Sequence, residues 1–312
     1  MARPFREEKM IGLSKHKLKI ITVILVLLAI ITLTISIGMN HPSFQTFLGK
    51  IRYYDQRCVD SQGVFAFYNV GNADASLIYT NQTIGFVDVG FRESIGVLTK
   101  NLSELKTDSL DFVVLSHPHS DHAGGYLELI KHVKIKRLFI RKYTQKDFEN
   151  LSLYNEILNA SQKEGIEVIY VTHGMNVHIG DISLLFYDGS HSSVDENHNS
   201  LLVKAKIGNT ECLYTGDAGK QVEQYLLSLG CDLSAEILKV GHHGSNSASS
   251  QEFLQTVSPL YSVISVGYNQ YDHPHKETIH HLIETGCTTY RTDICERILF
   301  EVKEAAIDVT VE

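Results

Sequence analysis

The sequence predicts an α/β fold of the α+β kind, with helices flanking mixed β-sheets, preceded by one N-terminal transmembrane helix. From about residue 64 onward, short runs rich in Val, Ile and Tyr alternate with segments expected to be helical. The soluble part, about 250 residues, is a normal size for one domain of two packed halves. Chains in which strands and helices alternate usually fold into sheets whose faces are covered by helices.

The N-terminal segment is expected to be an uncleaved membrane anchor. The segment 20–38 is uncharged, and its eighteen residues Ile20–Ile37 would span about 27 Å as a helix, close to the thickness of a bilayer core. It is apolar on all sides, unlike an amphipathic core helix. The basic tail at 1–19 predicts a cytoplasmic N-terminus and an extracellular location for the rest of the chain. We therefore expect a single-pass protein of the cell membrane, with a stalk at 39–62 and a folded domain at 63–312.

Within that domain, the first strands are expected to form a meander. Runs rich in β-branched and aromatic residues predict strands at 64–69, 75–80, 83–88, 111–116, 137–140, 166–171, 182–187, 200–207, 210–215, 236–240 and 260–266. The segments between them predict helices at 94–105, 124–132, 147–164, 218–229, 250–257 and 276–285.

The most informative stretch reads SHPHSDHAGG, at 116–125, and directly follows an apolar run. Three histidines and an aspartate fall within six positions: His117, His119, Asp121 and His122. A strand ending at Ser116 would deliver all four at its carboxyl end. His117 and His119 are two positions apart, so their side chains can point the same way. Asp121 and His122 lie further along the chain and can face a second point in space. Imidazole and carboxylate are ligands that zinc accepts, so the stretch predicts metal binding.

Two later segments offer the ligands needed for a second metal. Asp217 follows the apolar run 212–214, and its carboxylate could bridge two cations. His242 and His243 follow the apolar run 237–240. Consecutive residues on an extended backbone point in opposite directions, so only one of this pair is expected to bind metal. His243 is favoured because it directly precedes a glycine, and the other histidine would then hydrogen-bond substrate or a carboxylate.

These motifs resemble the metallo-β-lactamase-fold hydrolases, whose HxHxDH signature matches residues 117–122 without a mismatch. Further motifs resemble a narrower branch, the hydrolase domain of bacterial competence (DNA-uptake) proteins and related cell-surface phosphorylcholine esterases. Those motifs are FVDVG at 86–90, TGDA at 215–218, KVGHHGS at 239–245, and VISVG at 263–267 followed by Asn269 and His273-Pro274. The resemblance runs from about Val64 to Val309. It implies a four-layer αββα sandwich with the metal loops gathered at one edge.

Two motifs depart from that branch. DVGQGDA reads NVGNADA at 69–75, where Asp74 is kept and could orient a ligand or contact substrate. TDxxG reads TDICE at 292–296 and lacks its glycine. These departures affect the inferred substrate more than metal binding.

The resemblance implies two divalent ions, with zinc expected and manganese as the alternative. It also implies a third histidine on the first metal, for which His198 and His191 both remain candidates. Ions about 3.5–4 Å apart, bridged by Asp217, would hold a water as hydroxide near neutral pH. Asp121, Asp88 and His273 are the expected catalytic residues. Asp88 would orient a metal-bound histidine; His273 could donate to a phosphate oxygen or protonate the leaving group.

Charge and cysteine content limit the function. Beyond the basic tail the chain has 22 Lys/Arg against 34 Asp/Glu. Tight DNA binding usually rests on basic patches, and the runs at 131–137 and 141–142 are the evident ones.

The chain has five cysteines, too few and too scattered to organise the fold. Cys287 and Cys295 are nevertheless close enough in sequence to form a disulfide between neighbouring strands.

The predicted function is a membrane-anchored extracytoplasmic di-zinc phosphodiesterase. Its substrate would be nucleic acid or an envelope phosphodiester. A membrane-protein partner could hold a nucleic-acid strand for it, and the oligomeric state is left open. The alternatives are a di-zinc hydrolase of an acyl or β-lactam-type substrate, and a non-catalytic metal-stabilised binding domain.

Overall fold

The computed structural model describes residues 61–144, 147, 150–189 and 196–312. The expected tail and membrane span, and all but the last two residues of the stalk, therefore lie outside the described residues. Within the described residues, no helix is both long and apolar enough to cross a membrane. The compact unit Ser61–Glu312 begins with a strand at Ser61.

The first sheet has eight strands in the order β17-β16-β1-β2-β3-β5-β7-β8. Their bounds are β1 Ser61–Tyr68, β2 Ala75–Tyr79, β3 Ile84–Val89, β5 Phe112–Val114, β7 Arg137–Ile140, β8 Glu167–Tyr170, β16 Arg297–Lys303 and β17 Ile307–Val311. Strands β3, β5, β7 and β8 are parallel, so their carboxyl ends meet at one edge. Two short strands, β4 Ser109–Leu110 and β6 Lys134–Ile135, pair separately.

The second sheet has seven strands in the order β15-β14-β13-β12-β11-β10-β9. Their bounds are β9 Asn176–Ile179, β10 Ile182–Asp188, β11 Leu201–Ile207, β12 Thr210–Tyr214, β13 Ile237–Lys239, β14 Tyr261–Ile264 and β15 Thr288–Arg291. Strands β12 to β15 are parallel, and their carboxyl ends also share one edge.

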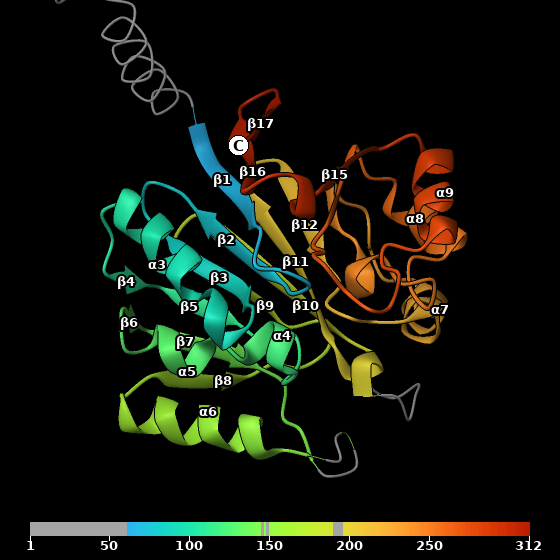
Figure 1. Cartoon of the computed structure of the whole chain (residues 1–312). Coiled ribbons are helices and arrows are strands. Elements are labelled where there is room, and N and C mark those ends of the chain that lie inside the picture. The colour runs from blue at the N-terminus through green and yellow to red at the C-terminus, as the bar shows by residue number, and fades with distance from the viewer. Residues whose placement is uncertain (1–60, 145–146, 148–149, 190–195) are drawn as a thin grey trace, which may run out of the picture. The chain divides into compact units, whose positions relative to one another are not determined.

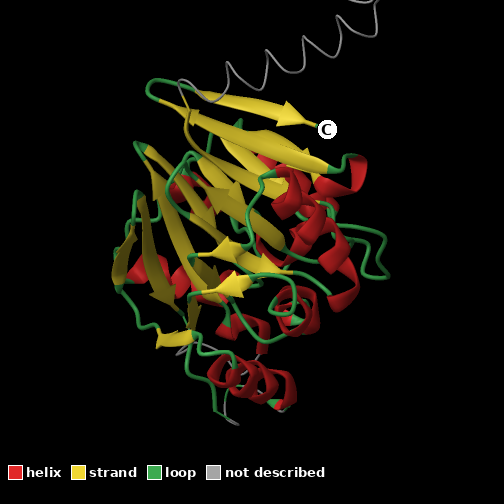
Figure 2. Cartoon of the chain, turned by 90° about the vertical axis from the view of Figure 1, so that its left-hand side faces the viewer, coloured by secondary structure: helices red, strands yellow, loops and turns green. Residues whose placement is uncertain are grey.

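Helices cover the outer face of each sheet (Figures 1 and 2). Those on the first sheet are α3 Ile95–Glu104, α4 Ser120–Ala123, α5 Tyr126–Leu129 and α6 Ser152–Lys163. Those on the second are α7 Lys220–Ser228, α8 Gln251–Val257 and α9 Lys276–Thr285. Among the described residues there are also four 3₁₀ turns: η1 Arg92–Ser94, η2 Glu196–Asn199, η3 Gly241–Gly244 and η4 Thr292–Ile294.

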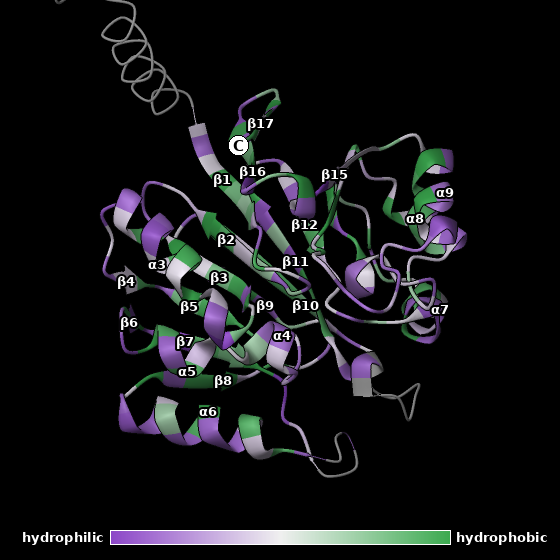
Figure 3. Cartoon of the chain, viewed as in Figure 1, coloured by the Kyte–Doolittle hydropathy of each residue, from purple (hydrophilic) through white to green (hydrophobic). Residues whose placement is uncertain are grey.

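Three apolar clusters hold these layers together. Between the sheets, Phe112 and Phe139 pack with Phe186 of the opposite sheet. On the outer face of the first sheet, Tyr126 and its neighbours cover the strands, and on the second sheet the equivalent cluster includes Leu254. Helix, sheet, sheet and helix therefore form the expected αββα sandwich, with polar residues toward the outer helix faces (Figure 3).

The structure differs from the expected single helix at 124–132. A helical turn instead begins at Ser120, inside the histidine-rich stretch, and a second turn starts after Gly125. The reason is a close backbone approach: Gly125 donates to the carbonyl of Gly90, and a Cβ at Gly125 would lie 2.4 Å from the Val89 carbonyl oxygen. The expected helix at 147–164 likewise begins later, at Ser152.

Six of the described strands were not predicted, namely β4, β6, β9, β15, β16 and β17. The last two return to the first sheet, where β16 pairs antiparallel with β1. The two halves of the sandwich are therefore not consecutive in sequence. A bridge between Cys287 and Cys295 is not formed: Cys287 contacts Ser262 across the second sheet, whereas the Cys295 thiol donates to the Arg291 carbonyl.

Candidate metal centre

The carboxyl ends of the parallel strands bring the candidate residues together. The loop after β5 and the first turn of α4 carry the four residues of the HxHxDH stretch. From the second sheet, Asp217 follows β12 and the GHHG turn follows β13. Ligands at the carboxyl ends of parallel strands are a general feature of α/β sheets. The site thus takes one half from each sheet.

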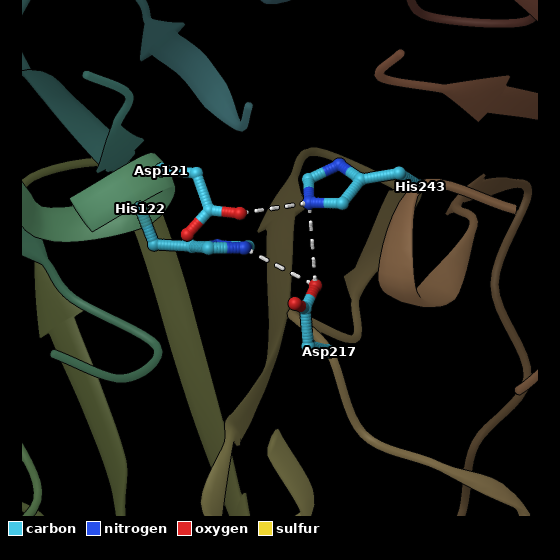
Figure 4. Close-up of side chains that lie close together, drawn as sticks. All are labelled: Asp121, His122, Asp217 and His243. Carbon is cyan, nitrogen blue, oxygen red and sulfur yellow. Dashed lines mark ion pairs between the residues drawn. The ribbon is translucent and has the colours of Figure 1, made fainter. Parts of the chain in front are cut away.

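Four of these side chains converge most closely (Figure 4). Asp121, His122, Asp217 and His243 each offer one ligand atom within 4.8 Å of the others. His243 Nε2 lies 3.4 Å from Asp121 Oδ2, and His122 Nε2 lies 3.1 Å from Asp217 Oδ1. The set contains two imidazoles and two carboxylates, and three of its four members are buried.

Asp217 faces two different pairs of histidines. Its Oδ1 lies 3.1 Å from Nε2 of His122 and 3.8 Å from Nε2 of His243. Its Oδ2 lies 3.9 Å from Nε2 of His117 and 3.7 Å from Nε2 of His242. One carboxylate therefore lies between two sets of nitrogen atoms, an arrangement suited to bridging two cations.

The orientation of His122 is set by Asp88. Asp88 Oδ2 lies 2.9 Å from Nδ1 of His122 and also accepts from the Ser116 hydroxyl, while Oδ1 accepts from the Ser116 amide. Asp88 has a positive φ of 55° at an irregularity in the pairing of β2 with β3. This local backbone strain is of the kind found at functional sites. With Nδ1 held, the other nitrogen of His122 faces the centre.

His243 and His117 are held in a comparable way. His243 Nδ1 lies 2.9 Å from the Ser265 carbonyl oxygen, so Nδ1 carries a proton, and Nε2 is the nitrogen that faces the centre. His117 Nδ1 lies within 3.2 Å of the hydroxyls of Ser116 and Ser200, and its Nε2 is 3.0 Å from Nδ1 of His119. An imidazole whose remote nitrogen is hydrogen-bonded in this manner is typical of metal ligands.

The structure contradicts the extended backbone assumed for the two consecutive histidines. His242 (φ 49°, ψ 50°) and His243 (φ 52°, ψ 24°) are both left-handed. Successive side chains of a left-handed turn do not point in opposite directions, and both rings reach Asp217. His242 is held by Ser247, whose hydroxyl lies 3.3 Å from its Nδ1. The expectation of a single metal-facing histidine was therefore built on the wrong conformation.

Electrostatics in the metal-free centre follow from burial and from its carboxylates. Burial by itself lowers the pKa of His122, but the carboxylates of Asp217 and Asp74 raise it well above the usual value. Burial likewise lowers the pKa of His243, but Asp217 and the neighbouring carboxylates raise it to about 9. Burial raises the pKa of Asp217, yet His122 and His243 hold it well below its usual range. Protons on the histidines thus balance the carboxylates where no cation does.

The remaining predicted residues lie around this centre. The His273 ring lies 5.6 Å from that of His242, between the centroids, and burial together with that neighbour lowers its pKa to about 4. His198 lies in η2, and Ser200, the residue that follows this turn, contacts His117. His191 is outside the described residues, so the choice between His198 and His191 stays open.

Sequence reasoning missed two contributors. Ser200 supports His117 and also accepts from the Asp217 amide at 3.0 Å, a role that no motif revealed. Lys239, which is 1% exposed, places its ammonium nitrogen 2.6 Å from Asp74 Oδ2. A lysine within the apolar run 237–240 was a usable signal, because a buried charge requires a partner.

The donor set fits divalent metal ions. Among the described residues, the buried atoms His122 Nε2, His243 Nε2 and Asp217 Oδ1 have no hydrogen-bond partner. Buried polar atoms in native proteins are almost always satisfied, so a group that accepts electron pairs is needed there. Imidazole nitrogen and carboxylate oxygen suit zinc and related divalent ions.

Comparisons with known proteins agree with this geometry. Residues 69–268 match the model of the metallo-beta-lactamase superfamily. The chain is 30% identical over 256 residues to ComE operon protein 3 of Bacillus subtilis, covering 76% of this chain and 32% of that protein. It is 26% identical to competence protein ComA of Neisseria gonorrhoeae, covering 85% and 36%. The chain thus spans about a third of the length of these curated relatives.

A solved structure gives the same fold. The metallo-beta-lactamase fold protein YhfI from Bacillus subtilis aligns with a TM-score of 0.53 and 10% identity, covering 80% of this chain and all of that one. The family match covers most of the sandwich, and the fold implies divalent metal ions at the centre described above. The chain belongs to the metallo-β-lactamase superfamily, as a metal-dependent hydrolase related to bacterial competence proteins.

Proposed function

We propose that this protein is a membrane-anchored, extracytoplasmic phosphodiesterase that uses two divalent ions, zinc in the first instance. The observation that carries the proposal is the position of Asp217, whose two oxygens face separate pairs of histidines. One ion would be held by Asp121, His122 and His243 with one oxygen of Asp217. The other would be held by His117, His119 and His242 with the second oxygen. His198 remains a further candidate for the latter.

The chemistry divides between the ions and the chain. When bound, divalent ions supply Lewis acidity toward a phosphoryl oxygen and lower the pKa of water. Asp88 holds the His122 proton on Nδ1, which keeps the other nitrogen free to bind. The Ser265 carbonyl does the same for His243. These contacts fix both rings before substrate arrives, so little reorganisation is required during the reaction.

His273 is assigned the role of hydrogen-bond donor. Its pKa of about 4 leaves the ring neutral at pH 7. Because almost no imidazolium is present at that pH, His273 is poorly suited to protonating a leaving group. A neutral ring can still donate one N–H to a phosphate oxygen. We therefore favour the first of the two roles considered for His273.

A nucleic-acid strand is the substrate we favour. Both curated relatives named above are competence proteins by name. Tyr268 and Tyr271, 99% and 68% exposed, lie in the same loop as His273, and the Tyr271 ring stacks on that of His273. Exposed aromatic rings beside a phosphodiester site suit unpaired bases. The acidic balance of the domain argues against tight unaided binding, so a membrane-protein partner would hold the strand.

Membrane anchoring is proposed from residues 1–38, which lie outside the described part of the chain. The uncharged stretch at 20–38 follows a basic tail, as in single-pass proteins with a cytoplasmic N-terminus. The domain would then act outside the cytoplasm, close to the membrane surface. Protease protection of an epitope tag on intact cells tests this orientation: a tag after Glu312 should be cleaved from outside.

The test of the activity uses the full chain in detergent micelles, loaded with zinc or manganese. Bis-p-nitrophenyl phosphate and single-stranded DNA are assayed side by side. Asp121→Ala should abolish both activities, whereas Asp181→Ala, at an exposed carboxylate bonded to Thr80, should retain them. Hydrolysis of the small diester alone would keep the chemistry and move the substrate to an envelope phosphodiester. Hydrolysis of neither by metal-loaded protein contradicts the proposal.

A further inference from the structure

We propose that the buried Asp74–Lys239 ion pair is a positioning device that holds the two halves of the metal centre together and supplies a permanent cation beside it. The inference rests on the proposed metal centre and deepens it. Asp74 Oδ2 and Lys239 Nζ are 2.6 Å apart, and both side chains are almost wholly buried. Neither residue belongs to the ligand sets described above.

The pair connects the two sheets. Asp74 lies at the end of the loop between β1 and β2 of the first sheet, and its amide donates to the Asp121 carbonyl at 3.0 Å. Lys239 ends β13 of the second sheet, and its carbonyl accepts from Thr215, just before Asp217. The metal centre is divided between these same two sheets. An ion pair across the division therefore sets the distance between Asp121 and Asp217.

The pair also lies on the remote side of both key histidines. Asp74 Oδ1 is 3.5 Å from Nδ1 of His243, and Asp74 Oδ2 is 3.7 Å from Nδ1 of His122. The Nε2 atoms of both rings face the centre instead. Asp74 is thus the one described carboxylate that approaches the remote nitrogen of both rings, one contributed by each sheet. A shift of Asp74 would move both rings.

The ammonium group of Lys239 explains why this second acidic cluster need not bind metal. Asp74, Asp88 and His122 are close enough to resemble a metal site by distance alone. Lys239 Nζ already neutralises Asp74, and it also donates to the Val240 carbonyl at 2.9 Å. A buried carboxylate is normally paired with a cation, and the chain itself supplies that cation here.

The chain offers a matched control for this lysine. Lys204 on β11 of the same sheet is also buried, at 4% exposure, and pairs with Asp232 and Glu211 away from the centre. Replacing either lysine with methionine removes one charge while keeping a long, flexible side chain. Lys239→Met leaves the buried carboxylate of Asp74 without this cation, whereas after Lys204→Met the Asp232 carboxylate is 72% exposed and Glu211 still pairs with Lys206. Only the change at Lys239 should reach the metal centre.

The experiment titrates the metal-free full chain in detergent micelles with Co²⁺ and follows the visible absorption spectrum. Wild type and Lys204→Met are expected to bind with the same affinity. Lys239→Met should bind at least one Co²⁺ about 10- to 100-fold more weakly and with an altered spectrum, as for other residues that orient ligands. Should Lys239→Met fail to fold by far-UV circular dichroism, Asp74→Asn carries the test, with the same expected loss.

The double variant Asp74→Asn/Lys239→Met separates positioning from simple charge balance. Removing both charges should recover thermal stability relative to Lys239→Met but leave Co²⁺ binding weak. Wild-type affinity in Lys239→Met or in the double variant would overturn the inference, as would an equal loss in Lys204→Met. If the wild-type chain itself binds no Co²⁺, the proposed metal centre fails as well, so the two failures are distinguishable.

Discussion

Nδ1 of His122 lies 2.9 Å from Oδ2 of Asp88, and this contact determines which nitrogen of the ring faces Asp217. Asp88 itself has little freedom. Its other oxygen accepts from the Ser116 amide at 2.8 Å, in a wholly buried environment where burial raises the pKa of its carboxyl. Asp88 thus connects Ser116, at the start of the histidine-rich stretch, to His122, the last histidine of that stretch.

Replacing Asp88 with asparagine should weaken metal binding without unfolding the protein. The single amide oxygen can accept from the Ser116 backbone, which turns the amide nitrogen toward His122 and forces the wrong tautomer onto its ring. We expect the affinity for zinc to fall by about 10- to 100-fold. Competition with a chromophoric chelator measures it. An unchanged affinity would mean that the tautomer of His122 is fixed by other contacts.

Metal uptake should release protons. The pKa of His122 lies well above its usual value in the metal-free centre and that of His243 is about 9, so both rings are charged at pH 7. A metal must displace those protons, and its affinity should therefore rise as the pH increases from 6 to 8. Calorimetry in buffers of different protonation enthalpy counts the protons, and about two are expected.

His273→Ala is the control for that count. The pKa of His273 is about 4, so the ring carries no proton to release at pH 7. The variant should bind metal with the same proton count as wild type. A metal-linked release of no protons in the wild-type chain would show that the two charged histidines are not displaced, and hence are not ligands.

Gly267→Ala should reduce activity while preserving metal content. A Cβ at Gly267 would lie 2.5 Å from the Gly71 carbonyl carbon and 2.7 Å from the Asn72 amide nitrogen, neither of which can move easily. The loop that follows carries His273, which Asn269 holds through hydrogen bonds to its backbone. Displacement of that loop should lower kcat/KM at least tenfold, with zinc content by atomic emission unchanged.

Gly96→Ala provides the comparison. Gly96 lies in α3, and nothing lies within 4 Å of the position its Cβ would take. Helix propensity then predicts a gain of about 0.5–1 kcal/mol in the free energy of unfolding and no change in activity. Equal activity losses in the two variants would mean that the loop contact of Gly267 is irrelevant to the reaction.

Phe139→Ala should strongly destabilise the sandwich. The side chain is fully buried between the sheets, with ring centroids 6.5 Å from Phe112 and 5.5 Å from Phe186. Truncation of such a residue costs about 3–5 kcal/mol, measured by urea unfolding. Tyr268→Ala, at a 99% exposed ring, should stay within about 0.5 kcal/mol of wild type. A small effect of Phe139→Ala would contradict tight packing between the sheets.

Local sequence pattern predicted eleven of the described strands and most of the described helices, because each of these elements has its own periodicity. The meander from β1 to β3 and helices such as α9 agree with their expected ranges. The helix at 124–132 was wrong because Gly125 approaches the backbone of another element, a contact that no local pattern encodes. The return of β16 to β1 was equally inaccessible, since pairing partners far apart in sequence leave no periodic signal.

For this protein, the sequence by itself determined the types and order of the candidate ligands and the family, because HxHxDH and the motifs around Asp217 and His243 are contiguous. Only the tertiary structure decided how these side chains are arranged around one another. The left-handed turn at 242–243 places both histidines near Asp217, and the packing of the two sheets against each other places Asp74 beside Lys239. The physical reason is that backbone handedness and contacts between distant strands depend on packing of the whole fold.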